Sequence, residues 1–417
     1  MAYDEITRLL GGWEGFALIE VTRAEGPRGP EIILRLEPVP GATRRCSRCG
    51  TVVTEVHETT ERRIRDLPIL EAQTWLIVPR ARLACPRCGP TVEAVPWLDR
   101  YQRMTTRLAE AIGRLAQLLP IKHVARWYGV DWGTVKQIDH RQLAARLGPV
   151  TAAALADVRV VVLDEFALQR GRRYATVALD PVRHRVLWVG RGRRREDIRP
   201  FFELLGPAGR ARLEAIAMDM NGPFAAEVRA QCPQAAIVYD LFHVVVQYAH
   251  QVLDRVRVEE TNRVGRAVRH DKRREARRRV IKGTRWLLLR RADHLTRPAD
   301  RVRLRELLAA NRALFIAYVL KDDLVQLWRY RTMPAARRAW ADWARRARSS
   351  RIPALVRFAE RLRAYVPGIL AHCRWPLHTS VLEGVNNKIK VIKRMAYGFR
   401  DDDYFFLKIR AAFPGIP

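Results

Sequence analysis

Five short apolar runs between residues 158 and 240 constrain the fold of this 417-residue chain more than any other feature of its sequence. The first three runs, VRVVVLDEFAL, YATVALD and VLWVGRG, follow one another closely. The last two, LEAIAMD and AAIVYD, each come after a stretch with helical periodicity. Runs of this length that are rich in Val, Ile and aromatic residues and end at turn-forming residues indicate strands. We therefore expect three antiparallel strands followed by two strands that helices connect.

Two of these predicted strands end in an aspartate, Asp164 in the first and Asp219 in the fourth. The strand order is that of an RNase H-like sheet, in which the first and fourth strands are neighbours, so both carboxylates would emerge at one edge. Two carboxylates there, with a third from a helix packed across the sheet, can hold two Mg²⁺ or Mn²⁺ ions about 3.5–4 Å apart for phosphodiester cleavage. Glu165 should point away from this edge because successive side chains of a strand alternate. The alternative is that both aspartates are ordinary turn formers.

The third carboxylate is expected from Glu383, in the segment VLEGVNNKIKVIK. The apolar residues of this segment recur at helical spacing along one face, namely Leu382, Val385, Ile389 and Ile392. Glu383 shares another face with Asn387 and Lys390, which would meet DNA phosphates behind the carboxylate. Glu383 also fits a capping box with Ser380. Because the other charged residues around Glu383 are positive, we favour a catalytic carboxylate over a cap alone.

The charge of the chain indicates a polyanionic partner. Lys and Arg number 76 against 44 Asp and Glu, which gives a formal net charge of +32. Nucleic acid is the commonest partner of such a field, and a membrane surface is the weaker alternative. No run reaches the roughly 18 apolar residues of a membrane span, and the first residues, MAYDEITRLL, lack the basic start of a signal peptide. We expect a cytoplasmic, nucleoid-associated protein that binds double-stranded DNA.

Two CxxCG motifs lie in the β-rich region 13–98. They are Cys46-Ser-Arg-Cys49 and Cys85-Pro-Arg-Cys88, each followed by a glycine. Each motif presents two thiolates to one tetrahedral ion, so the pair predicts a structural Zn²⁺ site with four cysteine ligands. The alternatives are four unligated cysteines, or a site in which His57 replaces one thiolate.

Residues 101–147 have helical periodicity, and their second part indicates a helix-turn-helix. A short helix, Ile121–Tyr128, would meet a turn at Gly129, and a second helix would open at Asp131. The residues expected to pack the inner face are Ala125, Val130, Val135 and Ile138. Such a second helix can enter the major groove of DNA, and its outward residues are Thr134, Lys136, Gln137 and Arg141. The alternative is an ordinary helical hairpin.

These motifs together resemble the DDE transposases of bacterial insertion sequences, and more narrowly the ISL-three group. The resemblance runs from the cysteine pairs and the helix-turn-helix through VVLDEFALQRGRRYATVALD to IAMDMNGPF, VYDLFHVV and LEGVNNKIKVIKRMAYGFRD. It implies that Asp164, Asp219 and Glu383 form the catalytic trio. It also implies a supporting role for His243 near the scissile phosphate, because Asp240-Leu-Phe-His243 matches the DxxH motif of related transposases. A buried histidine on a helix is the alternative for His243.

The long stretch between Asp219 and Glu383 exceeds what an RNase H-like core requires. It is rich in Arg, Ala and Leu with helical periodicity, so we expect an all-helical insertion. The first part of this insertion, residues 255–283, is strongly basic and is expected to guide the DNA backbone rather than to be only a solvated face. The expected domains of this multidomain α+β chain are a zinc-binding β-rich domain (1–98), a helix-turn-helix domain (99–150), an RNase H-like core (151–250), the helical insertion (251–375) and a C-terminal part of the core with the Glu383 helix (376–417).

The sequence therefore predicts a DNA transposase. Its N-terminal modules would bind the terminal inverted repeats, and its core would cleave DNA and join it to target DNA. A homodimer on DNA is expected because two ends must be brought together. A zinc and helix-turn-helix transcription regulator, and an RNase H-like nuclease without strand transfer, are the alternatives. Strand cleavage would exclude the first alternative, and strand transfer would exclude the second.

Overall fold

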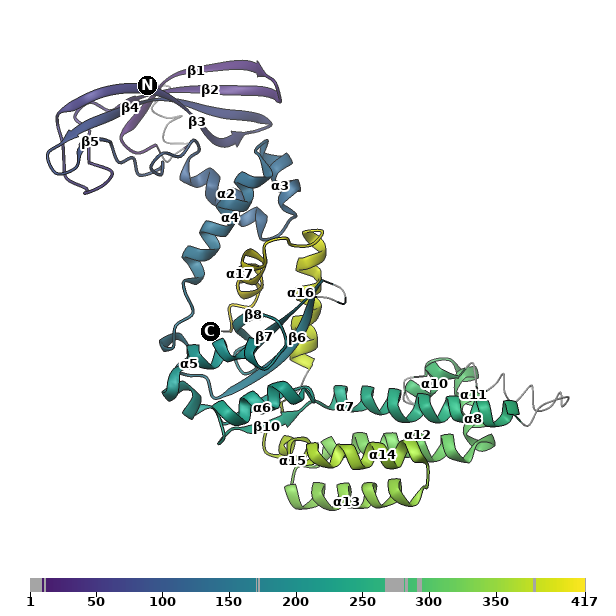
Figure 1. Cartoon of the computed structure of the whole chain (residues 1–417). Helices are drawn as coiled ribbons and strands as arrows, with labels where there is room; N and C mark the ends of the chain where they lie inside the picture. The colour runs from purple at the N-terminus through teal and green to yellow at the C-terminus, as the bar shows by residue number, and fades with distance from the viewer. Residues whose placement is uncertain are drawn as a thin grey trace. The chain divides into compact units, whose positions relative to one another are not determined.

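The computed structural model describes residues 10, 13–169, 171, 173–266, 281, 284–290, 295–377 and 380–416, with the side chains of residues 265, 266 and 380–383 outside the description. The chain folds into two compact units, whose helices and strands are labelled in Figure 1. Unit 1 comprises Met1–Gly148 and Ile392–Lys408, and unit 2 comprises Pro149–Val391 and Ile409–Pro417. Most of the basic segment 255–283 lies outside the described residues, so its contact with the DNA backbone stays a prediction.

Unit 1 begins with a five-stranded sheet. Its strands are β1 (Phe16–Gly26), β2 (Gly29–Pro38), β3 (Val56–Ile69), β4 (Ala72–Cys85) and β5 (Gly89–Val92). β1 and β2 form an antiparallel hairpin, β2 runs parallel to β4, and β3 and β5 both pair with β4 in antiparallel fashion. Buried side chains of the strands, among them Leu34, Leu76 and Val78, form a core with Trp13 and Trp97. The N-terminal region is β-rich, as predicted.

Both CxxCG motifs are turns of this sheet region. Cys85 is the last residue of β4, and Gly89 is the first residue of β5. Gly50 and Gly89, which follow the two cysteine pairs, have φ angles of 72° and 69°. Only glycine adopts this left-handed conformation without a steric cost, which explains the glycine after each pair. Ala81 and Leu83 form a small core with the cysteines.

Three helices follow the sheet and share a core of their own. They are α2 (Thr106–Ala116), α3 (Ile121–Tyr128) and α4 (Trp132–Leu147). α3 ends at Gly129, whose φ of 63° is left-handed, and Asp131 caps α4 by accepting a hydrogen bond from the Gly133 amide at 2.7 Å. The predicted inner residues pack as expected, with Ala125, Val135 and Ile138 buried and Val130 partly buried. The predicted helix-turn-helix is confirmed.

A buried carboxylate joins the sheet of unit 1 to α2. Asp66 of β3 has no exposed surface. Its carboxylate accepts hydrogen bonds from Trp13 Nε1 at 3.0 Å and from Thr105 Oγ1 at 2.6 Å. Arg107 Nε donates to the same carboxylate at 2.8 Å. The β-rich region and the helix-turn-helix, predicted as separate domains, therefore lie within one compact unit.

The C-terminal helices are divided between the two compact units. The sequence assigned all of residues 376–417 to the RNase H-like core, but residues 392–408 belong to unit 1. The physical reason is α17 (Asp402–Ala412), whose Tyr404 and Lys408 contact the buried Asp139 of α4. Consequently α16 (Ser380–Met395) and α17 each contribute residues to both units.

Unit 2 contains a second five-stranded sheet, with the predicted strand order. Its strands are β6 (Val160–Gln169), β7 (Arg173–Asp180), β8 (Arg185–Arg191), β9 (Ala215–Met218) and β10 (Ala236–Tyr239). β6, β7 and β8 form an antiparallel meander, while β9 pairs in parallel with β6 and β10 in parallel with β9. The connecting helices are α5 (Arg199–Arg212) before β9 and α6 (Gly222–Gln231) before β10. The resulting order, β10-β9-β6-β7-β8, is that of an RNase H-like sheet.

Between β10 and α16 the described residues contain helices and no strand, which agrees with the predicted helical insertion. α7 (Leu241–Tyr248) continues through a π-helical turn (Ala249–Leu253) into α8 (Asp254–Arg266). The helices that follow are α10 (Arg285–Leu289), α11 (Pro298–Ala310), α12 (Arg312–Gln326), α13 (Met333–Ser349), α14 (Pro353–Leu362) and α15 (Val366–Leu370). Among the described helices, none combines the length and the apolar character that crossing a membrane requires.

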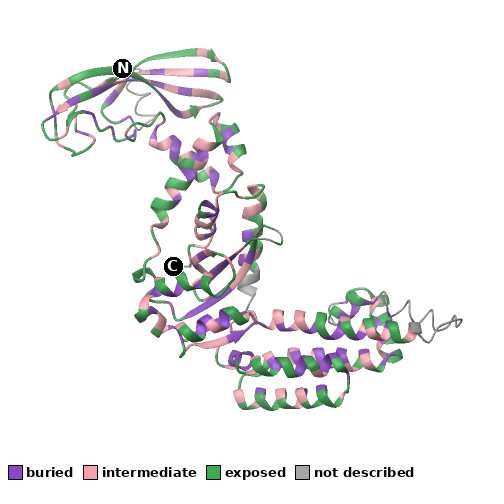
Figure 2. Ribbon diagram, viewed as in Figure 1, coloured by how far each residue is buried: buried purple, intermediate pink, exposed green. Residues whose placement is uncertain are grey.

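Aromatic side chains hold this helical insertion together. The ring of Tyr248 lies edge-on to Phe358 with centroids 5.1 Å apart, and its hydroxyl donates to the Ala317 carbonyl at 2.7 Å. Trp343 Nε1 donates to the Leu320 carbonyl at 2.7 Å. Figure 2 shows buried residues along α12 and α14, in the middle of the bundle. The insertion therefore has a packed core rather than a set of independently solvated helices.

Candidate functional sites

Asp164 lies in the middle of β6, which corrects the prediction that it ends its strand. β6 continues to Gln169 because β7 goes on pairing with it, and Asp164 itself stands opposite Val177. The pairing of β6 with β9 covers only Val160–Val162. The apolar run of β6 therefore ends close to the end of its pairing with β9. Asp164 is the second residue of β6 after the last pair, Val162 with Ala217.

Asp219 directly follows β9, and the register of the parallel strands sets it level with Asp164. Val162 of β6 stands opposite Ala217 of β9. Two residues further along each strand are Asp164 and Asp219, and side chains two residues apart in a strand share a face. The sheet therefore brings the two aspartates to the same edge, as the strand order predicted.

Burial and mutual repulsion make both carboxylates weak acids. The pKa of Asp219 is raised to about 6, mainly by burial; the charge of His243 opposes this shift, and the charges of Glu165 and Asp164 contribute to it. Burial also raises the pKa of Asp164, to which the charge of Asp240 adds. Perturbed carboxylates gathered at one edge of a sheet are typical of functional sites, because ionising them requires a compensating positive charge.

Asp240 and His243 stand at the start of α7, after β10. Asp240 is buried and caps α7 by accepting a hydrogen bond from the Phe242 amide at 2.9 Å. His243 Nε2 lies 3.7 Å from Asp240 Oδ2, and the His243 side chain is 36% exposed. The alternative of a buried structural histidine is therefore wrong, and His243 is available to a ligand at this edge.

α16 contributes a residue that the sequence reasoning missed. Asn386 Nδ2 donates a hydrogen bond to Asp164 Oδ2. Asn387 and Lys390, which were predicted to share a face with Glu383 and to meet DNA phosphates, are both exposed on α16. The side chain of Glu383 lies outside the described residues, so its place in the catalytic trio stays a prediction. The buried residues Val385 and Ile389 were predicted correctly.

Glu165, to which the prediction gave no role, belongs to the surroundings of the site. Its Oε1 accepts a hydrogen bond from Asn221 Nδ2 at 2.7 Å. Asn221 follows Asp219 by two residues and caps α6 by accepting from the Phe224 amide at 3.2 Å. Strand alternation alone could not reveal this contact, because it depends on the turn between β9 and α6.

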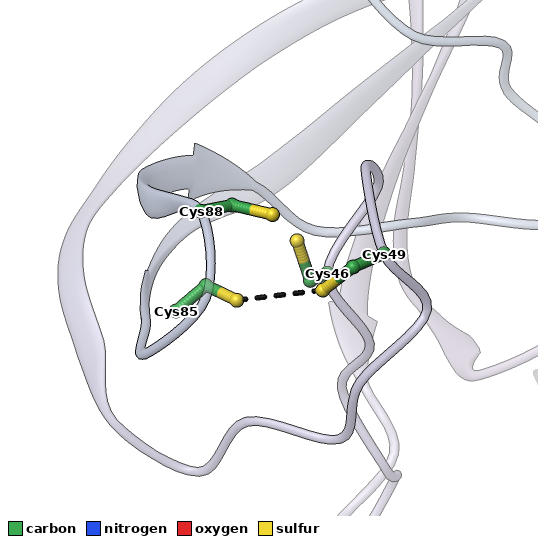
Figure 3. Close-up of side chains that lie close together, drawn as sticks. All are labelled: Cys46, Cys49, Cys85 and Cys88. Carbon is green, nitrogen blue, oxygen red and sulfur yellow. Dashed lines mark hydrogen bonds between the residues drawn. The ribbon is translucent and has the colours of Figure 1, made fainter.

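The four predicted cysteine ligands converge in unit 1. Their Sγ atoms all lie within 4.8 Å of one another, and Figure 3 shows them pointing toward a common centre. Cys49 Sγ and Cys85 Sγ are 3.6 Å apart, close to the roughly 3.8 Å that tetrahedral Zn–S bonds of about 2.3 Å imply. His57 is exposed and does not belong to this cluster. The four thiols fit a structural zinc ion.

The ionisation of the cluster suits a metal as well. Hydrogen bonds with Thr51 lower the pKa of the Cys49 thiol to about 6. A hydrogen bond with Cys49 and burial raise the pKa of Cys88 to about 12, and repulsion by the negative charges of Cys46 and Cys49 adds to this shift. A cation bound between them reverses that repulsion, since zinc ligands are thiolates.

The outer face of α4 carries three of the four predicted DNA contacts. Gln137 and Arg141 are exposed and Thr134 is partly exposed. Lys136 is different, because its Nζ lies 2.8 Å from Asp401 Oδ2 and 5.6 Å from the Tyr404 ring centroid. Lys136 is therefore engaged by the C-terminal segment of unit 1, which the sequence did not indicate. Arg141 pairs loosely with Asp99 at 3.7 Å.

Three family models match the chain in the order of its modules. A zinc-finger model of the IS204/IS1001/IS1096/IS1165 transposases matches residues 42–88. A helix-turn-helix model of transposase family ISL3 matches residues 93–143. A model of the DDE type, described as a transposase of the same ISL3 group, matches residues 161–409, which is more than half of the chain.

Two curated relatives extend over nearly the whole chain. The chain is 50% identical over 408 residues to the transposase for insertion sequence element IS1001 of Bordetella parapertussis, which covers 97% of each chain. It is 28% identical over 402 residues to the transposase for insertion sequence element IS1557 of Mycobacterium tuberculosis, which covers 92% of this chain and 88% of the relative. These similarities favour a transposase over a transcription regulator, and the chain belongs to the ISL3 family of insertion-sequence transposases.

Proposed function

We propose that this transposase cuts DNA at the ends of its insertion sequence and joins the freed 3′ ends to target DNA. The proposed catalytic residues are Asp164, Asp219 and Glu383, which would hold two Mg²⁺ or Mn²⁺ ions. The register of β6 and β9 supports this most directly, because it sets Asp164 level with Asp219. The contact of Asn386 with Asp164 adds support, since Asn386 lies less than one helical turn after Glu383.

The residues at this edge fit divalent cations. Carboxylate oxygens are the ligands that Mg²⁺ prefers in proteins. The pKa values of Asp164 and Asp219 are raised by burial and by neighbouring carboxylates, so a bound cation would favour their ionised forms. When bound, two such ions activate the attacking oxygen and stabilise the leaving 3′ oxygen.

The remaining residues of the site would act on the DNA itself. His243, partly exposed beside Asp240, would donate a hydrogen bond to an oxygen of the scissile phosphate. Asn387 and Lys390 are exposed on α16 and would contact phosphates flanking the cleaved bond. These contacts would hold the phosphodiester at the carboxylates, and in-line attack requires such orientation.

The N-terminal modules would recognise the terminal inverted repeats. Thr134, Gln137 and Arg141 lie on the outer face of α4, which is the arrangement of a recognition helix in the major groove. The zinc site would maintain the β-rich region that adjoins this helix-turn-helix in unit 1. We propose a homodimer on DNA, because two element ends must be joined to one target.

Cleavage of DNA that carries the ends of the element tests this function. Wild-type protein with Mg²⁺ or Mn²⁺ is expected to cut at the element boundary. Asp164→Asn and Glu383→Gln should bind the ends normally but cut more than about 100-fold more slowly, because each removes a ligand charge. Glu203→Gln, which removes an exposed carboxylate on α5, is the control and should cut normally. Equal cutting by wild type and Glu383→Gln would show that Glu383 is only a helix cap.

Strand transfer distinguishes a transposase from a nuclease of the same fold. Pre-cut ends with free 3′ hydroxyls are incubated with a supercoiled target plasmid. We expect covalent joining of the ends to the plasmid, dependent on Asp164 and Asp219. Cleavage of intact ends without joining of pre-cut ends would support the nuclease instead.

A further inference from the structure

Asn386 fixes the carboxylate of Asp164 from the side of α16. Asp164 Oδ2 accepts a hydrogen bond from Asn386 Nδ2, and Asp164 Oδ1 accepts one from the Glu165 amide at 2.7 Å. Both oxygens are therefore oriented by the protein. An ionised carboxylate has about four acceptor positions, so each oxygen keeps one position for a further partner.

The other end of the Asn386 side chain has no such partner. Asn386 Oδ1 is buried and accepts no hydrogen bond from any residue in the described part of the chain. The amide cannot simply be turned over, because its oxygen would then face the oxygen of Asp164. Buried acceptors without a donor are rare in proteins and call for an explanation. A cation bound by Asp164 would explain this acceptor, because a water molecule on the cation would donate a hydrogen bond to Asn386 Oδ1.

We propose that Asn386 is a further residue of the cation site, whose nitrogen orients Asp164 and whose carbonyl oxygen accepts from the hydrated cation. This inference rests on the proposed function, because it takes Asp164 to be a cation ligand. The chemistry suits the position. Mg²⁺ keeps several waters and needs oxygen acceptors around them. An amide supplies that oxygen without adding another negative charge to Asp164, Asp219 and Asp240.

The test is a Mn²⁺ titration of the zinc-loaded full chain, in which electron paramagnetic resonance reports the free Mn²⁺. Asn386→Ala is expected to weaken Mn²⁺ binding about tenfold, the lower range for partners that support a metal ligand. Asn386→Leu keeps a side chain of similar size but has neither the donor nor the acceptor, and should weaken Mn²⁺ binding to a similar extent. Val391→Ala is the matched control on the exposed side of α16 and should leave the Mn²⁺ affinity unchanged.

Thermal unfolding without Mn²⁺ separates this role from a purely structural contact. If Asn386→Ala melts at a lower temperature but binds Mn²⁺ like the wild type, the inference is overturned. If Asn386→Ala does not fold, Asn386→Leu decides, and Mn²⁺ binding as tight as that of the wild type by that variant also overturns the inference.

Asp164→Asn tells the two possible failures apart. If Asp164→Asn abolishes the Mn²⁺ binding seen in the wild type, while Asn386→Ala binds Mn²⁺ as tightly as the wild type, only the role of Asn386 is refuted. If the wild type binds Mn²⁺ no more tightly than Asp164→Asn does, the proposed cation site itself is refuted, and the inference about Asn386 with it.

Discussion

Tyr404 of α17 donates its hydroxyl hydrogen to the carboxylate of Asp139 on α4, across 265 positions of sequence. Asp139 has no exposed surface and also accepts a hydrogen bond from Gln117, the residue that follows α2. Lys408 Nζ lies 2.8 Å from the same carboxylate and supplies its counter-charge. The buried carboxylate thus ties the C-terminal helix to two helices of the DNA-binding module.

Removing this network is expected to destabilise unit 1. Tyr404→Phe should lower the free energy of unfolding by about 1–2 kcal/mol, because it removes one hydrogen bond to a charged group. Asp139→Ala should cost about 3 kcal/mol, because it leaves the Lys408 ammonium without its buried partner. Calorimetric unfolding measures both. Glu110→Ala, which breaks only the exposed pair with Arg114, should change stability by less than about 0.5 kcal/mol. Equal losses in all three variants would contradict this account.

The cysteine cluster is expected to hold one zinc ion per chain. Cys49→Ser and Cys88→Ser should each lose the metal, because a structural zinc site needs all four ligands. Without zinc, the β-rich region should lose β-structure, and the protein should no longer bind DNA that carries the ends of the element, since metal binding and folding are coupled at such sites. Elemental analysis and circular dichroism measure these effects. Cys373→Ser changes a thiol outside the cluster and should keep the zinc. Full zinc content in Cys49→Ser would contradict the site.

The residues of α4 are expected to differ in their effect on DNA binding. Gln137→Ala and Arg141→Ala should each weaken binding to the element ends by about 1–3 kcal/mol and reduce the preference for those ends over random DNA. Lys136→Ala should affect the preference less, because Lys136 is paired with Asp401. Fluorescence anisotropy with end and random duplexes measures both quantities. A larger loss of preference in Lys136→Ala than in Gln137→Ala would contradict the assignment of the outer face.

The raised pKa of Asp219 predicts a pH-dependent stability in magnesium-free buffer. Its pKa is about 6 in the folded chain against an ordinary 3.8, so the folded state holds the proton more tightly than the unfolded state. The contribution of Asp219 to stability should therefore fall as the pH rises from about 4 to 6, by about 1–2 kcal/mol after solvent screening. Asp219→Asn removes this cost.

Calorimetric unfolding at two pH values checks this expectation. Asp219→Asn should be more stable than wild type at pH 7.5 and similar to it at pH 4. Added Mg²⁺ should stabilise the wild type and not the variant. Destabilisation of the variant at pH 7.5 without Mg²⁺ would contradict the raised pKa.

Local spacing explains most of what could be predicted. The two CxxCG motifs, the limits of α3 and the succession of strands and helices in unit 2 all depend on contacts between neighbouring residues or on short periodic patterns. Contacts between elements could not be predicted in this way. Neighbouring positions on a helix differ by about 100° in direction, so the predicted face of Glu383, Asn387 and Lys390 gave no sign that Asn386 contacts Asp164. Similarly, β6 continues past Asp164 because of its partner β7, which no pattern within β6 reveals.

The sequence by itself determined the modules of this transposase and their order, because turns, caps and apolar periodicity act over a few residues. It also indicated that Asp164 and Asp219 lie at the same edge of the sheet. Only the tertiary structure decided which groups meet across long separations. Neither the hydrogen bond of Tyr404 to Asp139 nor the ion pair of Lys136 with Asp401 can be predicted from the residues next to them in the sequence. The physical reason is that a polar residue finds its buried partner only when the whole core has packed, since burial without that partner is costly.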